Sequence, residues 1–262
     1  MNMDKIQAKL DALKQSQQRT GTATWKWKPK PDPKSPKDSV KYTVRVLPNP
    51  ADPDDPFIEA KFYYEFAKKT LIAPCTFGHP DPVLEFAEKL RSDRTSESWK
   101  LAKKIEPKDR YFAAVLVRGE EDKGPRWWDF SKTTYQDFLT LATDPDYTGY
   151  ENLKDGRDIT VEFTPAQAEG TFPSISLLPR PKTTPATTDK EVLNQIREMK
   201  PVFEYYVEPT YDELVSHMEN YFNGTETTSE PSKPTPAAKS NDVSTTTKSD
   251  VDDAFDELFN QN

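Results

Sequence analysis

The stretch Arg110-Tyr-Phe-Ala-Ala-Val-Leu-Val117 is a near-continuous apolar run, and it decides the fold class. Its aromatic and β-branched residues favour an extended strand. Apolar side chains at successive positions are typical of a strand whose two faces are both covered. We therefore predict a central strand of a sheet at these residues.

Shorter strand patterns flank this run on both sides. Residues 40–47 alternate between apolar and polar side chains, as a strand with one buried face does. Further strands are predicted at 57–66, 70–75, 158–164 and 171–178, and helices at 81–91, 95–105, 132–142, 189–199 and 210–222. Short strands with helices inserted between them favour a small Greek-key barrel over a parallel α/β sheet.

The two ends of the chain differ in composition from the middle. Residues 3–18 carry apolar side chains at helical spacing and predict a short amphipathic helix. Residues 225–262 begin with Thr, Ser, Pro, Lys and Glu, which bury too little to offset the entropy of ordering, so we expect disorder. The acidic tip that follows fits either a docking peptide for a basic, apolar groove or a solubilising tail. Its candidate partner-binding residues are Asp252, Asp253, Phe255, Asp256, Leu258 and Phe259.

The net charge of −8 is unevenly distributed. Residues 24–118 carry nineteen Lys/Arg and fourteen Asp/Glu, whereas residues 119–224 carry ten and twenty. Because the local field governs contact, clustered basic residues in the first half can bind phosphates despite the acidic total. We expect a soluble protein without a membrane span or signal peptide, and the single cysteine, Cys75, fits a reducing cytoplasm.

The sequence offers little for catalysis. It has two histidines, no glycine-rich phosphate loop, and neither a GxSxG nor an HExxH motif. Cys75 and His79 supply two metal ligands where a structural zinc takes four. We expect a protein that is not an enzyme.

Aromatic and basic residues alternate in four places, which is typical of proteins that bind single-stranded nucleic acid. Bases stack on aromatic rings, and Lys or Arg contact the phosphates. The four places are Trp25–Lys28, Lys41–Arg45, Trp99–Tyr111 and Arg126–Trp128. The alternative for each aromatic residue is packing in the core, the commoner fate of Trp and Phe.

Seven segments, in this order, resemble one protein family. They are Trp25-Lys-Trp-Lys28, Val44-Arg-Val-Leu-Pro48, Pro56-Phe-Ile58, Cys75 with His79, Trp99–Lys104, Tyr111–Val117 and Trp128-Asp-Phe130. The chain resembles the single-stranded DNA-binding (helix-destabilising) proteins of T-even-type bacteriophages, in a version like those of cyanobacterial myoviruses.

The resemblance implies a mixed β-barrel with helices and three parts. Residues 1–23 would be an N-terminal helical arm for cooperative contacts between protomers. Residues 24–224 would be an OB-fold core with an inserted small subdomain at about 60–108. Residues 225–262 would be the disordered linker and acidic protein-interaction tip.

The implied function is to coat and protect single-stranded DNA during phage DNA replication, recombination and repair, in the cytoplasm of the infected bacterial host. The protein would self-associate along the DNA, and its acidic tail would recruit phage replication and recombination proteins. Two rival functions remain. One is a non-enzymatic scaffold or adaptor with an OB-like barrel that binds protein partners, and the other is an enzyme that acts on nucleic acid.

The resemblance also implies a set of DNA-binding residues. Its stacking aromatics correspond to Trp99, Tyr111 and Trp128, with Phe112 at a second aromatic site. Its phosphate-contacting residues correspond to Arg45, Lys103 and Lys104. From local charge alone we add Arg110 and Lys132.

The family often holds zinc through three cysteines and a histidine, and this sequence departs from that pattern. Only Cys75 and His79 are present, and the expected upstream histidine falls on Tyr63 or Tyr64. We therefore expect no zinc and no other cofactor, with apolar packing of the helix at 81–91 in place of the metal.

Overall fold

The computed structural model of the chain describes residues 25–52, 54–64, 69–92, 95–168 and 170–222. The predicted N-terminal arm and its helix at 3–18 lie outside these residues, as do the linker and the acidic tip.

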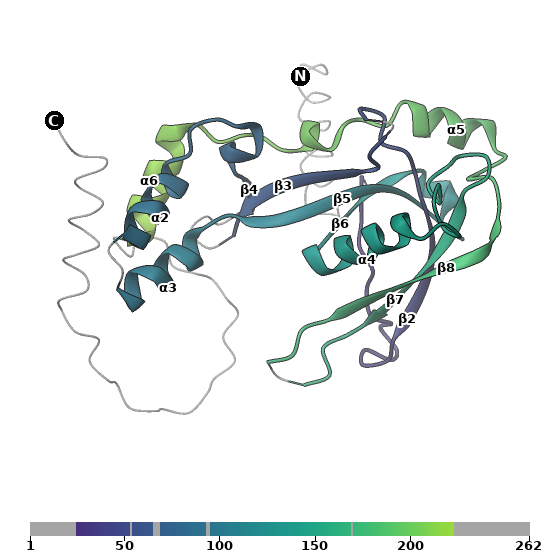
Figure 1. Cartoon of the computed structure of the whole chain (residues 1–262), viewed down its shortest axis with the longest axis horizontal. Helices are drawn as coiled ribbons and strands as arrows, with labels where there is room; N and C mark the ends of the chain where they lie inside the picture. Colours follow the sequence, from purple (N-terminus) through teal and green to yellow (C-terminus); the bar gives the residue numbers. More distant parts are fainter. Residues whose placement is uncertain (1–24, 53, 65–68, 93–94, 169, 223–262) are drawn as a thin grey trace, which may run out of the picture. The chain divides into compact units, whose positions relative to one another are not determined.

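The described strands form one mixed sheet (Figure 1). Six of them follow the order β1-β6-β5-β2-β7-β8, and β3 pairs with β4 off this path. The mixed sheet with helices agrees with the prediction, but within the described residues the path has two ends, β1 and β8, and does not close into a barrel. The strands are β1 (Lys26–Trp27), β2 (Val40–Val46), β3 (Phe57–Tyr63), β4 (Leu71–Ile72), β5 (Lys108–Val117), β6 (Arg126–Phe130), β7 (Arg157–Thr164) and β8 (Ser174–Thr183).

The central strand is the one that the apolar run predicts. β5 lies between β2 and β6 and is antiparallel to both, with Val117 opposite Val44 and Tyr111 opposite Phe130. Every residue from Tyr111 to Val117 is buried. Both faces of β5 are therefore covered, as an uninterrupted apolar run requires.

The five predicted helices of the described chain are confirmed, with bounds shifted by one or two residues. The predicted strand at 70–75 is shorter, because Pro74 cannot donate to the ladder and begins a 3₁₀ turn instead. The helices are α2 (Pro82–Ser92), α3 (Ser96–Ile105), α4 (Lys132–Thr143), α5 (Lys190–Arg197) and α6 (Tyr211–Phe222), with 3₁₀ turns η1 (Pro74–Phe77), η2 (Glu121–Lys123) and η3 (Val202–Tyr205).

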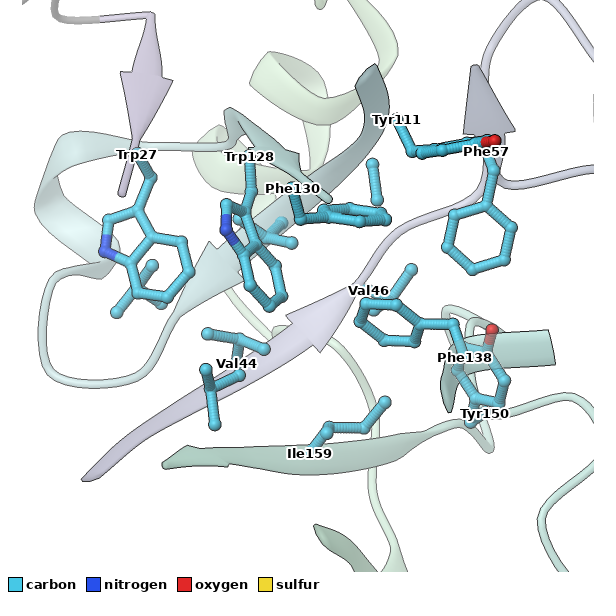
Figure 2. Packing of buried hydrophobic residues seen from close by; sticks show 14 residues of the cluster. Trp27, Val44, Val46, Phe57, Tyr111, Trp128, Phe130, Phe138, Tyr150 and Ile159 are labelled. Carbon is cyan, nitrogen blue, oxygen red and sulfur yellow. The ribbon is translucent and has the colours of Figure 1, made fainter. Parts of the chain in front are cut away.

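The chain divides into two compact units. Unit 1 contains the described residues up to Glu59 together with Arg110–Glu204. Its core packs side chains of β1, β2, β5, β6 and β7 against α4 (Figure 2). Aromatic rings dominate this core, and Trp27 meets Trp128 edge to face with ring centroids 5.1 Å apart.

Unit 2 contains Ala60–Asp109 together with the described residues from Tyr205 onward. A second apolar core joins α2, α3 and α6 to the end of β3 and to β4. The structure thus places α6 with the segment at 60–109. The family resemblance implies an insertion limited to about 60–108, which leaves the residues of α6 outside it.

Candidate nucleic-acid interface

Helix α3 of unit 2 carries the strongest combination of exposed aromatic and basic side chains. The helix begins at a favourable cap, because the Thr95 hydroxyl accepts a hydrogen bond of 3.1 Å from the Ser98 amide. Ser98, Ala102 and Ile105 are buried and turn one side of the helix toward the unit 2 core. The exposed side then presents Trp99, Lys100, Lys103 and Lys104, which we call the α3 face.

Two lysines of the α3 face lie close to aromatic rings. Trp99 is 50% exposed, and the Lys103 ammonium lies 5.2 Å from the centre of its indole ring. The Lys104 ammonium lies 5.4 Å from the ring of Tyr221 on α6. An exposed indole with ammonium groups beside it can stack on a base while the lysines meet the neighbouring phosphates.

Lysines outnumber carboxylates on α3, which carries Lys100, Lys103 and Lys104 against Glu97. Glu97 lies in the first turn of the helix, where it interacts favourably with the positive end of the helix dipole. Glu106, just past the last turn, pairs with Arg91, with oxygen–nitrogen distances of 2.6 and 2.7 Å. Lys108 donates a hydrogen bond to the carbonyl oxygen of Lys103 and adds a further cation to this end of the helix.

Three of the predicted stacking residues are buried in unit 1, and two of them, Tyr111 and Trp128, belong to its core. Trp128 has no exposed surface, and Phe112 and Tyr111 are 1% and 5% exposed. The Tyr111 ring is stacked on Tyr135, with centroids 4.1 Å apart. A base cannot reach rings that are covered in this way, so the core-packing alternative describes these three residues.

Arg45, a predicted phosphate contact, is a buried structural residue. Its side chain is fully buried, its Nε donates to Asp158 at 3.0 Å, and its two terminal nitrogens donate to the Thr184 carbonyl and hydroxyl at 2.8 and 2.7 Å. Arg118 shares the same Asp158 carboxylate. The structure therefore does not place Arg45 at the surface, where a phosphate contact would need it, and its donors are used by Asp158 and Thr184.

The remaining predicted residues fall into two groups. Trp99, Lys103 and Lys104 lie together on the α3 face, as the sequence predicts. Lys132, at the first residue of α4, is exposed but belongs to unit 1. Arg110 also belongs to unit 1, where it pairs with Asp129 at 2.7 Å.

The structure adds Lys100 to the α3 face and Lys26 to the neighbours of Asp129. Both lysines lie within the aromatic–basic segments of the sequence. Their spacing was therefore a usable signal, although the residue set drawn from the family resemblance omits them.

Cys75 and His79 supply two of the four ligands that a structural zinc takes. Within the described ranges there is no group of three or more His, Cys, Asp or Glu side chains that could hold a metal. His79 contacts Glu208, with 2.8 Å between Nδ1 and the carboxylate oxygen. Tyr63, one of the two positions at which the family's histidine would fall, donates a 2.6 Å hydrogen bond to the buried carboxylate of Asp81.

The Asp81 carboxylate links three elements of unit 2. Besides Tyr63, it accepts hydrogen bonds from the amide of Cys75 at 3.3 Å and from that of Val83 at 3.2 Å. These bonds connect β3, η1 and the start of α2. Burial and the neighbouring Asp81 raise the pKa of the Cys75 thiol to about 11, which disfavours the thiolate that zinc requires.

Native Cys75 is expected to react with iodoacetamide about 100-fold more slowly at pH 8 than it does in the urea-unfolded chain, because the raised pKa suppresses its thiolate. Alkylation rates followed by mass spectrometry test this, with the unfolded chain as the control. The raised pKa stabilises the folded state below the unfolded thiol pKa, and this contribution is lost as pH rises toward 11. Equal rates in the two states would contradict the assignment.

Among the described helices, none is long and apolar enough to cross a membrane. No protein-family model matches the chain, and a search of curated proteins finds no significant match.

Proposed function

We propose that this protein binds single-stranded nucleic acid through the α3 face and performs no catalysis. The observation that carries the proposal is the half-exposed Trp99 with the Lys103 ammonium 5.2 Å from its ring and two further lysines on the same helix. A base stack contributes about 1–3 kcal/mol whatever the base, so such a face suits binding without sequence preference.

We further propose single-stranded DNA as the natural ligand and coating of that DNA in phage replication, recombination and repair as the role. The aromatic–basic segments and their order along the chain support this. In this proposal the sheet of unit 1 is an opened relative of the OB-fold, and residues 60–109 are an insertion into it. The arm at 1–23 would link protomers, and the tip with Phe255, Leu258 and Phe259 would recruit replication and recombination proteins.

Neutralising the α3 face should reduce the salt dependence of binding. For single strands, the slope of log K against log salt concentration is about −0.7 per phosphate contact, so three contacts account for about −2. A triple variant with Lys100, Lys103 and Lys104 replaced by Met is expected to lose a large part of that slope and to bind oligo-dT more weakly. Fluorescence anisotropy of a labelled oligo-dT at several salt concentrations measures both quantities.

A matched control is a triple Met variant of Lys154, Lys190 and Lys200. All three lysines are exposed, and each has a carboxylate nearby. Lys154 is followed in the sequence by Asp155, Lys190 stands between Asp189 and Glu191, and the Lys200 ammonium lies 3.7 Å from Glu204. The control removes the same total charge from places where a carboxylate already offsets it. An equal loss of slope in the two triple variants would show that the α3 face is not the contact surface.

A further inference from the structure

Three adjacent strands of unit 1 place two cations on either side of one carboxylate. Asp129 of β6 lies opposite Phe112 of β5, and Lys26 of β1 lies opposite Trp127 of β6. Residues two positions apart on a strand share a face, so Arg110 and Lys26 are the diagonal neighbours of Asp129. This face is opposite the one that buries Trp27, Trp128 and Phe130 in the unit 1 core.

Arg110, Asp129 and Lys26 form a row of side chains across β5, β6 and β1. The contacts within this row are short and specific. Arg110 Nη2 lies 2.7 Å from one oxygen of Asp129, and the Lys26 ammonium lies 3.2 Å from the other. The Lys26 ammonium is also held between two rings, 5.8 Å from the centre of Trp25 and 5.9 Å from that of Phe112. Because the Phe112 ring is buried, it provides a fixed support for the lysine.

The row carries a surplus positive charge that faces solvent. The side chains of Lys26 and Arg110 are 30% and 25% exposed, whereas that of Asp129 is 11% exposed. Burial alone would oppose ionisation of Asp129, but Lys26 and Arg110 outweigh it and lower the pKa of the carboxyl group. The cluster is therefore two cations and one anion at neutral pH.

The cations also keep unused hydrogen-bonding capacity. Arg110 Nε is buried and has no hydrogen-bond partner among the described residues. A single carboxylate cannot satisfy all the donors of a guanidinium and an ammonium group. Arg110 Nε itself is covered, but at the exposed parts of Lys26 and Arg110 a phosphodiester oxygen supplies the missing negative charge and a further acceptor.

We infer that Lys26 and Arg110 form a second contact point for the sugar–phosphate backbone of a single strand, with Asp129 as the residue that positions both cations. The inference rests on the proposed function and extends it from the α3 face to unit 1. Trp25, at the edge of this row, is the aromatic side chain placed to meet a sugar or base next to the bound phosphate.

The test compares three variants of the full chain in oligo-dT titrations across salt concentrations. Lys26→Met and Arg110→Met each leave Asp129 with one cation, so the buried carboxylate stays compensated. Each is expected to weaken binding about 10-fold and to reduce the salt slope by about 0.7. Thermal melting checks that each variant is folded.

The positioning role of Asp129 makes a prediction opposite to that of overall charge. Asp129→Asn makes the protein more positive, and a general electrostatic effect would tighten binding. We expect weaker binding, by about 3-fold or more, because the two cations lose the group that orients them. Asp146→Asn, an exposed site in unit 1, is the matched control and should bind at least as tightly as the wild type.

The outcomes separate this inference from the proposed function. Wild-type protein that does not bind oligo-dT would overturn both. Binding that depends on the α3 face but is unchanged in Lys26→Met and Arg110→Met would overturn only the second contact point. Tighter binding by Asp129→Asn would overturn the positioning role. Sodium phosphate at the same ionic strength as chloride should compete only weakly; strong competition would mean that the row is a site for free phosphate.

Discussion

Arg45→Met should lower the free energy of unfolding by about 3–5 kcal/mol, the cost typical of breaking a buried ion pair. Arg45 has no exposed surface, and its guanidinium donates to Asp158 and to both the carbonyl and the hydroxyl of Thr184. Methionine fills a similar volume but removes the donor from the buried carbonyl and hydroxyl of Thr184, and it leaves Asp158 with Arg118 as its remaining cation. Urea unfolding followed by circular dichroism measures the loss.

The control for Arg45 is Lys41, which lies on the same strand. The Lys41 ammonium is 3.6 Å from Glu162, and its side chain is 62% exposed. Lys41→Met should therefore cost less than about 1 kcal/mol. If Arg45→Met unfolds at the wild-type urea concentration but binds oligo-dT poorly, Arg45 is a phosphate contact after all and its burial does not describe the binding conformation.

Trp99→Ala should weaken oligo-dT binding by about 1–3 kcal/mol, which is roughly a 5- to 150-fold rise in Kd. Because the indole is half exposed, the same substitution should change the free energy of unfolding much less than truncation of a core tryptophan would. Trp99→Phe keeps an aromatic face and should retain most of the affinity. Isothermal titration calorimetry measures both variants.

Leu139→Ala is the matched control for Trp99. Leu139 is 41% exposed on α4, so its truncation removes exposed apolar surface without removing a ring. Unchanged affinity of Trp99→Ala, or an equal loss in both variants, would exclude base stacking on Trp99 as the source of affinity.

Local patterns in the sequence predicted the parts of the fold that depend on local spacing. The apolar run at 110–117 is the central strand. Its apolar side chains point alternately to the two faces of the sheet, so both faces need cover. The sequence predicted the helix at 95–105, and in a helix of period 3.6 Trp99 and Lys103, four residues apart, lie on one side.

Long-range contacts explain what local patterns left open. The apolar run predicts cover on both faces of β5, whereas the family resemblance assigns Tyr111 and Phe112 to the DNA-binding set, and the structure buries both side chains. The local sequence around Arg45 predicts a cation at the surface. Its partner Asp158 lies on β7, more than a hundred residues away in the sequence. Closure of a barrel likewise depends on which strand edges meet, and strand spacing alone does not determine this.

Tryptophan fluorescence of the wild-type chain during titration with oligo-dT tests the central claim most directly. Trp27, Trp127 and Trp128 are buried, so Trp99 and Trp25 are the two of the five tryptophans placed to respond to a bound base. Binding to the α3 face predicts saturable quenching that added salt reverses, with a reduced amplitude in Trp99→Ala. An emission spectrum that does not change with oligo-dT at low salt would contradict the account.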